Sequence, residues 1–193
     1  MRKELSEMTL EELWELFPII LNEHNTIYKQ WYEIEKKRLL GCIDARDIVR
    51  INHIGSSAVK GLIAKPTIDI LLEINNKSNI QELAHTLQYY GWIVMSEVKG
   101  PSMRMVFNKG YTKDGFAEKV YHLHVRYYDN WDELYFRDYL IAHKEVAKEY
   151  GNLKLRLMEK YKHNRDGYTQ AKSEFILKYT VKAKNEYGNK YKP

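Results

Sequence analysis

The chain has 193 residues, of which 44% are hydrophobic and 30% are charged, and its formal net charge is +5. This composition supports a folded core and excludes a disordered chain, and no stretch approaches the roughly 18 uncharged apolar residues of a membrane-spanning helix. The single cysteine, Cys42, excludes an intramolecular disulfide. The acidic segment 1–17 lacks the cationic start of a signal peptide. We therefore expect a cytoplasmic protein without membrane contact.

The positive charge is concentrated at the C-terminal end. From Lys154 onward there are eleven Lys or Arg residues and four Asp or Glu residues, whereas the rest of the chain is slightly acidic. A basic segment can attract phosphates or nucleic acid, although charge runs more often belong to solvated helix faces. The charge pattern alone leaves both interpretations open.

The first part of the chain predicts two helices. Thr9 and Glu12 form the sequence signature of a capping box, which opens a short helix. Apolar residues at helical spacing predict a second helix over Ile27–Leu40, and we expect Gly41 to end it.

The middle of the chain predicts a sheet. Alternating apolar residues indicate strands over Ile48–Ile54 and Thr67–Ile74, separated by a loop rich in small residues over Gly55–Pro66. We expect Ser78 to cap a helix over Ile80–Tyr90.

Three more strands and three helices are expected downstream. The strands are Trp92–Val98, Met103–Asn108 and Glu118–Arg126, and the helices are Trp131–Ile141, Lys144–Tyr161 and Tyr168–Ala183. Strands in the middle with helices at both ends predict an α+β fold with helices packed on one side of a sheet. We expect one domain over 1–193, with N-terminal helices over 1–45, the sheet core over 46–128 and C-terminal helices over 129–193.

The segment Asn52–Ile74 carries the clearest chemical signal, and it reads NHIGSSAVKGLIAKPTIDILLEI. One predicted strand delivers Gly55 and Ser56, and the next presents Asp69. Glycine lets backbone amides approach an anion closely, and a serine hydroxyl can hold a phosphate oxygen. A carboxylate such as Asp69 can hold Mg²⁺ between the protein and a phosphate. This division of labour suits nucleotide transfer, which depends on positioning and charge neutralisation.

The Gly-Ser pair, the spacer and the Asp between apolar residues resemble the signature of the nucleotidyltransferase superfamily. The full string is similar to the central motif of the GrpB family, and three downstream segments agree in order. These are His122-Leu-His-Val125, Phe136-Arg-Asp138 and Tyr168-x-x-x-Lys172-x-x-Phe175-Ile176. The resemblance covers residues 31–179. It implies a nucleotidyltransferase-like mixed sheet with a C-terminal helical segment, and by analogy transfer of a nucleotidyl group from a nucleoside triphosphate to a small acceptor.

Two departures bear on the reaction. Active nucleotidyltransferases usually carry a second carboxylate two residues after the first, where this chain has Leu71, and Glu73 lies one pair further along the same face. The GrpB pattern has His122 and His124 where the superfamily uses a third acid. One Mg²⁺ or Mn²⁺ ion at Asp69 with a histidine nearby is one expectation. The alternative is a catalytically degenerate module that binds a nucleotide or another ligand.

The candidate site residues follow from the motif and its neighbours. The candidate catalytic residues are Asp69, His122 and His124, with Asp69 also the metal ligand, and the candidate phosphate-binding residues are Gly55, Ser56, Ser57, Lys65, Arg104, Arg126 and Lys172. Each has a structural explanation as well: a tight turn for the glycine, helix caps for the serines and an ion pair with lysine or arginine for Asp69. The histidines suit a hydrogen-bonded interior pair and the arginines suit surface ion pairs. For His53 we favour a packed role, and for Arg137 with Asp138 an internal brace.

Overall fold

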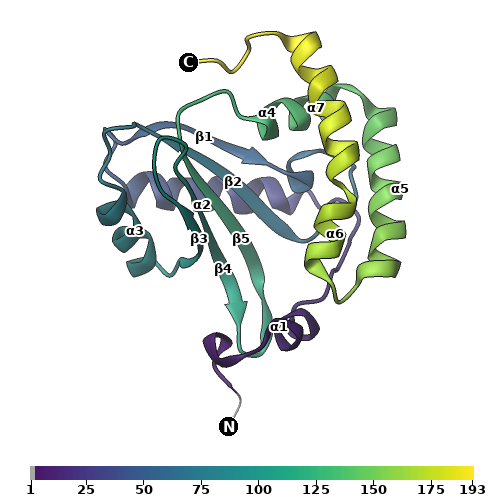
Figure 1. The fold of residues 1–193 in the computed structure, drawn as a ribbon, viewed down its shortest axis with the longest axis horizontal. Helices are drawn as coiled ribbons and strands as arrows, with labels where there is room; N and C mark the ends of the chain where they lie inside the picture. Colours follow the sequence, from purple (N-terminus) through teal and green to yellow (C-terminus); the bar gives the residue numbers. More distant parts are fainter. Residues whose placement is uncertain (1–2) are drawn as a thin grey trace.

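A computed structural model describes residues 3–193, and the first two residues of the expected domain lie outside the described part. Its centre is a five-stranded mixed sheet in the order β1-β2-β5-β4-β3 (Figure 1). The strands are β1 (Ile48–Ile54), β2 (Thr67–Ile74), β3 (Ile93–Val98), β4 (Arg104–Thr112) and β5 (Gly115–Tyr127). Strands β2 and β5 run parallel, whereas the other neighbouring pairs are antiparallel. The expected α+β class and mixed sheet are confirmed.

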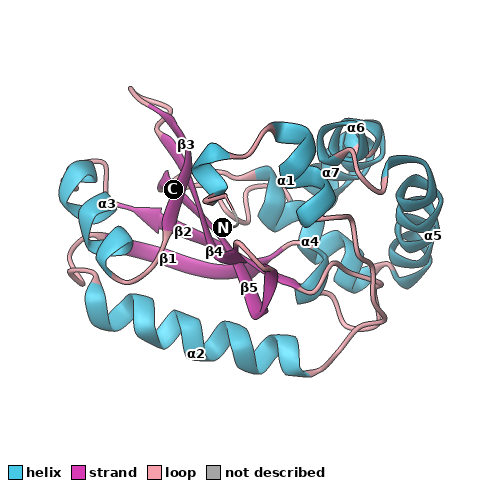
Figure 2. Ribbon diagram, turned by 90° about the horizontal axis from the view of Figure 1, so that it is seen from below, coloured by secondary structure: helices cyan, strands magenta, loops and turns pink. Residues whose placement is uncertain are grey.

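One face of the sheet packs on α2 (Ile27–Cys42) and α3 (Ile80–Tyr89) (Figure 2). The alternation of β2 explains this, because Ile68, Ile70 and Leu72 all point to that face and are 0% exposed. Burial of such side chains stabilises each by about 1.5–3 kcal/mol relative to exposure. The main hydrophobic core therefore lies between the sheet and these two helices.

The opposite face meets the C-terminal helices, which are α4 (Asp132–Ala142), α5 (Lys144–Tyr161), α6 (Arg165–Ala171) and α7 (Ser173–Tyr187). Leu71 of β2 packs there with Ile54 and with Leu134 of α4. The expectation that the helices pack on one side was wrong. The reason is that β2 carries apolar side chains on both of its faces, so both faces must be covered.

The N-terminal segment closes the lower end of the sheet. The helix α1 (Leu10–Leu16) follows a short 3₁₀ turn (Leu5–Glu7), and the Thr9 capping box is present in both of its hydrogen bonds. Phe17 then packs against the rings of Tyr111 and Phe116. None of the helices within residues 3–193 is long and apolar enough to span a bilayer.

Several expected boundaries were wrong: β5 begins at Gly115 where Glu118 was expected, and four further differences have a clear cause in local or tertiary contacts. The helix α2 continues through Gly41, because Leu39 and Ile43 are buried in the core and hold its last turn. Asn79, not Ser78, caps α3, since its side chain accepts a hydrogen bond from the Glu82 N–H. The remaining two concern β4 and the last helix.

The strand β4 runs to Thr112, beyond the expected end at Asn108. An irregularity between Lys109 and Tyr111 with Gly110 at φ +90° lets the pairing with β5 continue. The expected helix Tyr168–Ala183 is two helices, because Asn164 caps α6 through a bond from the Gly167 N–H and a break follows at Lys172. Both differences bring side chains to the site described below.

Candidate functional site

The motif forms a tight strand-to-turn junction. Strands β1 and β2 are adjacent, and Ile54 pairs with Asp69. The strand that delivers Gly55 and Ser56 therefore lies beside the strand that presents Asp69, as predicted. Gly55 follows at φ +70°, and a 3₁₀ turn (Ser56–Ala58) begins directly after it. A Cβ at Gly55 would lie 2.4 Å from Oδ2 of Asp69, so the junction has room for glycine alone. Gly55, Ser56 and Asp69 consequently border the same two cavities.

Asp69 begins a chain of hydrogen bonds that runs across the sheet. Its Oδ1 lies 3.0 Å from Nδ1 of His122, and Nε2 of His122 lies 2.7 Å from the Tyr111 hydroxyl. Burial raises the pKa of Tyr111 to about 12, so its phenol stays protonated and donates to His122. His122 then donates from Nδ1 to Asp69, which selects one tautomer of the ring.

The charge state of Asp69 is set by opposing effects. Burial raises its pKa, but the hydrogen bond from His122 and the nearby His122, His124 and Lys65 side chains outweigh this and lower the pKa overall. The carboxylate is therefore ionised at neutral pH, with 28% of its side chain exposed to the cavities. His124 lies on the same face of β5 and borders the cavity that contains Asp69, and burial lowers its pKa.

The lysine pocket is a cavity of about 190 Å³ beside this chain. It is lined by Leu21, Gly55, Ser56, Ser57, Lys65, Asp69, Tyr150, Lys154, Tyr168 and Lys172. The Lys154 ammonium donates to Ser56 Oγ at 2.9 Å and to the Ile63 carbonyl. The Lys172 ammonium lies 4.2 Å from the centroid of the Tyr168 ring. Three lysines thus converge on one carboxylate.

Burial lowers the pKa of all three lysines. The pKa falls to about 7 for Lys154 and to about 8 for Lys65 and Lys172. Neighbouring cations add to the effect of burial, since Lys172 acts on Lys154, Lys65 acts on Lys172 and Arg165 acts on Lys65, while Asp69 opposes each shift. The side chains of the pocket therefore provide too little negative charge for its three lysines.

The unbalanced positive charge predicts that the stability difference between wild type and a Lys154 variant depends on pH. The unfavourable burial of charged Lys154 is fully present below its folded pKa of about 7 and is relieved as pH rises toward the ordinary value of 10.5. We expect Lys154→Met to gain stability relative to wild type at about pH 6 and to lose more than half of that advantage by about pH 9, because the ordinary pKa of 10.5 still lies above that pH. Thermal melts at both pH values measure the difference. Lys178→Met, on the exposed face of α7, is the matched control and should show no such change.

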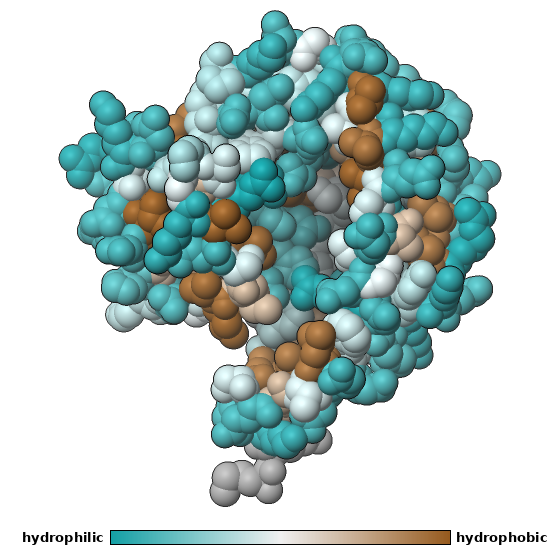
Figure 3. Space-filling model, in the orientation of Figure 1, coloured by the Kyte–Doolittle hydropathy of each residue, from teal (hydrophilic) through white to brown (hydrophobic). Residues whose placement is uncertain are grey.

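The apolar chamber is a second cavity, of about 350 Å³, on the other side of the same junction. Its apolar wall is formed by Ile54, Phe136, Leu140, Tyr150 and Ile176. The two cavities share Gly55, Ser56, Asp69 and Tyr150. Figure 3 shows a hollow near the centre of the molecular surface, between the sheet and the C-terminal helices. The combination suits a ligand with one anionic part and one flat or apolar part.

Comparison with known proteins identifies the family. The sequence profile described as GrpB protein matches residues 18–182. The chain belongs to the GrpB family. It is 36% identical over 162 residues to the glutamate-rich protein GrpB of Alkalihalophilus pseudofirmus, covering 82% of this chain and 91% of that protein.

Other GrpB relatives agree with this assignment. The UPF0157 protein YqkA of Bacillus subtilis is 31% identical over 79% of this chain, which spans 43% of that protein. The crystal structure of conserved protein GrpB from Enterococcus faecalis superposes with a TM-score of 0.75 and 27% identity, covering 87% of this chain and 99% of that one. The GrpB fold therefore extends over most of the chain.

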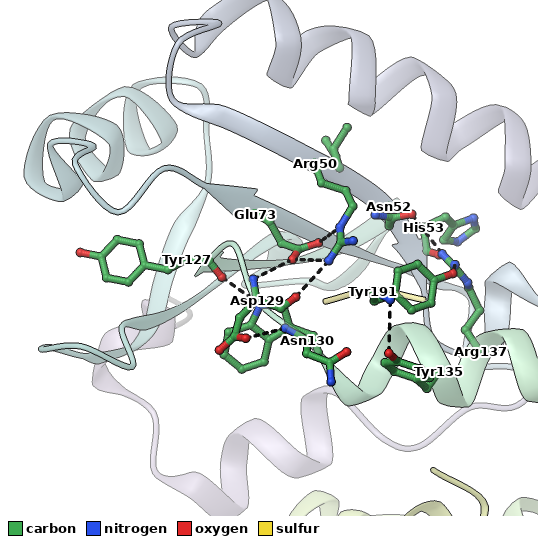
Figure 4. Close-up of polar contacts among 12 residues, drawn as sticks. Arg50, Asn52, His53, Glu73, Tyr127, Asp129, Asn130, Tyr135, Arg137 and Tyr191 are labelled. Carbon is green, nitrogen blue, oxygen red and sulfur yellow. Dashed lines mark hydrogen bonds and ion pairs between the residues drawn. The ribbon is translucent and has the colours of Figure 1, made fainter. Parts of the chain in front are cut away.

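Two motif segments of the GrpB pattern are structural. Arg137 pairs with Asp138 at 2.8 Å and donates to the His53 carbonyl at 2.9 Å, so the Phe136-Arg-Asp138 segment braces α4 against β1 (Figure 4). His53 stacks on Tyr32 with centroids 4.8 Å apart and is bonded to Ser57 at 3.1 Å. The brace and the packed histidine were both expected.

A buried ion pair explains Glu73, the other carboxylate on the Asp69 face of β2. Glu73 is 0% exposed and is bound by Arg50 Nε at 2.5 Å and Nη2 at 2.7 Å. Arg50 also donates to the Asp129 carbonyl at 3.0 Å, which ties β1 to the loop before α4 (Figure 4). Glu73 therefore stabilises the scaffold and stands outside both cavities.

The structure places the candidate residues unevenly. Eight of the ten lie at the cavities or in the hydrogen-bond chain: Gly55, Ser56, Ser57, Lys65, Asp69, His122, His124 and Lys172. Arg126 pairs with Glu133 at 2.6 Å, and Arg126 and Arg104 flank the Trp131 ring. These two arginines border neither cavity, so the structure does not bring them together with the other candidates, and their phosphate contact stays a prediction.

Sequence reasoning missed Lys154, Tyr150, Tyr168 and Tyr111. A signal for Lys154 was present, because it follows Ala147 and Tyr150 at helical spacing on the apolar face of α5, where a charge is out of place. Tyr111 was hidden by the expected end of β4 at Asn108.

A divalent metal, which the superfamily resemblance implies, does not fit these residues by themselves. Leu71 fills the second carboxylate position and is 0% exposed in the core, and Glu73 is held by Arg50. Within residues 3–193 no group of three or more His, Cys, Asp or Glu side chains is arranged to hold a metal ion. Asp132 and Glu133 also line the apolar chamber but pair with Lys184 and Arg126. Of the motif's own carboxylate positions Asp69 alone remains, and one carboxylate holds Mg²⁺ only together with phosphates of a bound ligand.

Proposed function

We propose that this GrpB-family protein binds a nucleoside triphosphate and transfers its nucleotidyl group to a small acceptor. The observation that carries the proposal is the junction of the two cavities. The lysine pocket suits phosphates, the apolar chamber suits a base or an apolar acceptor, and Asp69 and Ser56 stand where the two meet. Such positioning and charge neutralisation are the main requirements of phosphoryl chemistry.

The residues have distinct roles in this scheme. Gly55, Ser56 and the lysines hold the phosphates. An acceptor hydroxyl attacks the α-phosphorus and loses its proton to His124, which borders the apolar chamber, while a new P–O bond forms, the bond from the α-phosphorus to the bridging oxygen breaks, and pyrophosphate leaves. His122, bonded to both Tyr111 and Asp69, holds the Asp69 carboxylate in place. A Mg²⁺ or Mn²⁺ ion shared by Asp69 and the phosphates would supply further charge neutralisation.

A second candidate is a binding module without turnover, and a specific observation favours it. Leu71 is part of a buried cluster with Ile54 and Leu134, so the fold uses the second carboxylate position for packing. A third candidate, nucleic-acid binding through the basic C-terminal part, is less favoured because many of its cations are engaged. Lys154 and Lys172 line the pocket, and Lys184 and Lys190 pair with Asp132 and Asp138. For location we propose the cytoplasm, where a protein with one unpaired cysteine is usual.

Asp69→Asn separates the enzyme from the module. Asparagine is nearly isosteric and its Oδ1 can still accept from His122, so we expect a stability change below about 1 kcal/mol. Pyrophosphate release from a nucleoside triphosphate, with Mg²⁺ or Mn²⁺ and a panel of small acceptors, should fall by about 100-fold or more. The matched control is Asp44→Asn, an exposed carboxylate paired with Arg46 outside both cavities.

The outcomes distinguish the candidates. Turnover by wild type that is lost in Asp69→Asn with an unchanged melt supports the transferase. Nucleotide binding without turnover under every condition supports the module. A large loss of stability in Asp69→Asn would show that Asp69 is a brace, and the catalytic proposal would then be abandoned.

A further inference from the structure

The lysine pocket has an excess of positive charge that no protein group balances. Lys65, Lys154 and Lys172 line it together with one carboxylate, Asp69. In the described part of the chain none of the three lysines forms an ion pair with Asp or Glu within 4.0 Å. Charges buried without partners are costly, so a pocket built this way is stabilised by an incoming anion.

The polar groups around these lysines also favour an anion. Tyr168 lines the pocket with its residue 1% exposed, and its buried hydroxyl has no hydrogen-bond partner among the described residues. A phenol can donate to an anion in this position. Ser56 already accepts from Lys154, which leaves its own hydrogen free to donate. These donors suit phosphate oxygens.

Asp69 is engaged through one of its oxygens, and the other lies beside the Gly55 backbone. Oδ1 accepts from Nδ1 of His122, and Oδ2 packs against Gly55 closely enough that an added Cβ would lie 2.4 Å away. His122 is fixed in turn by Tyr111. In this arrangement the carboxylate orients a histidine, which is a different task from holding a metal ion.

We propose that the pocket binds a di- or triphosphate group through the ammonium groups of Lys65, Lys154 and Lys172, without requiring a divalent cation, while Asp69 positions His122. When all three lysines are protonated, as a bound anion favours, two positive charges remain after Asp69 is counted, and they match a polyphosphate better than a single phosphate. The inference rests on the proposed function in one respect, that the ligand carries phosphates. It deepens that proposal by assigning charge neutralisation during binding to lysines.

Calorimetric titration with inorganic triphosphate, pyrophosphate and phosphate tests this, first in EDTA and then in excess Mg²⁺. We expect triphosphate to bind in EDTA, and to bind more tightly than pyrophosphate or phosphate. Its affinity in EDTA should be at least as high as in excess Mg²⁺. Each of Lys65→Met, Lys154→Met and Lys172→Met should weaken binding by about 10-fold or more, because each removes a charge-assisted contact. The control Lys178→Met should stay within about twofold, since exposed charges contribute little.

Asp69→Asn provides the sharpest comparison. If lysines carry the binding, removing the one negative charge should leave triphosphate affinity in EDTA unchanged or raise it. If a metal bridge carries it, wild type will bind only with Mg²⁺, and that result would falsify the inference. A loss of binding by Asp69→Asn in EDTA would overturn it as well. Melts of each variant guard against unfolding, and the three separate lysine variants keep the test intact if one does not fold.

Failure of this inference and failure of the proposed function give different results. Triphosphate binding in EDTA without nucleotide turnover keeps the lysine site and removes the transferase. Nucleotide turnover with Mg²⁺ but no triphosphate binding in EDTA keeps the transferase and removes metal-independent binding.

Discussion

Gly55→Ala is expected to damage both the fold and the site. The residue has φ +70°, which alanine tolerates poorly, and the new Cβ would lie 2.4 Å from Asp69 Oδ2 and 3.1 Å from its Cγ. Strain and overpacking together should lower the free energy of unfolding by about 2–4 kcal/mol. The displaced backbone also moves Ser56 and the Lys154 ammonium bonded to it, so triphosphate affinity should fall by about 10-fold or more. Denaturant unfolding and calorimetric titration measure the two effects.

Gly61→Ala is the matched control for this substitution. Gly61 also has a positive φ, of +82°, but an added Cβ would meet nothing within 4 Å. It should lose about 1 kcal/mol from backbone strain alone and keep its affinity. Equal losses in the two variants would mean that the contact between Gly55 and Asp69 is unimportant.

Arg50→Met is expected to cause the largest loss of stability. It leaves the Glu73 carboxylate, which is 0% exposed, without its two bonds from the guanidinium. Breaking a buried ion pair on one side costs about 3–5 kcal/mol. Urea unfolding of wild type and variant measures the change.

The double variant Arg50→Met with Glu73→Met tests the cause. Replacing both charges by apolar groups of similar size removes the unpaired carboxylate, so most of the lost stability should return. If the double variant is as unstable as the single one, the loss comes from the bond to the Asp129 carbonyl or from packing of Arg50 on Tyr128. The difference in the free energy of unfolding between the single and double variants therefore measures the cost of leaving Glu73 unpaired.

Local patterns in the sequence determined much of this fold. Strands β1 and β2 have the expected bounds, because their alternating apolar residues match the two-residue period of a strand. The Thr9 capping box and the helix α5 also agree with expectation, since they depend on contacts within a few residues. The motif Asn52–Ile74 predicted the GrpB family and the adjacency of Gly55, Ser56 and Asp69.

Only the tertiary structure decided what surrounds that motif. Lys154 meets Ser56 across 98 positions of sequence, and Tyr111 reaches His122 through an irregularity in β4. The apolar face of α5 indicates that Lys154 is buried, but only chain topology decides which groups its ammonium meets. Long-range packing also decided that helices cover both faces of the sheet. It likewise decided that Glu73 pairs with Arg50. The sequence by itself therefore determined the strand pair that carries Asp69, whereas three-dimensional packing decided that lysines, and no second carboxylate, surround it.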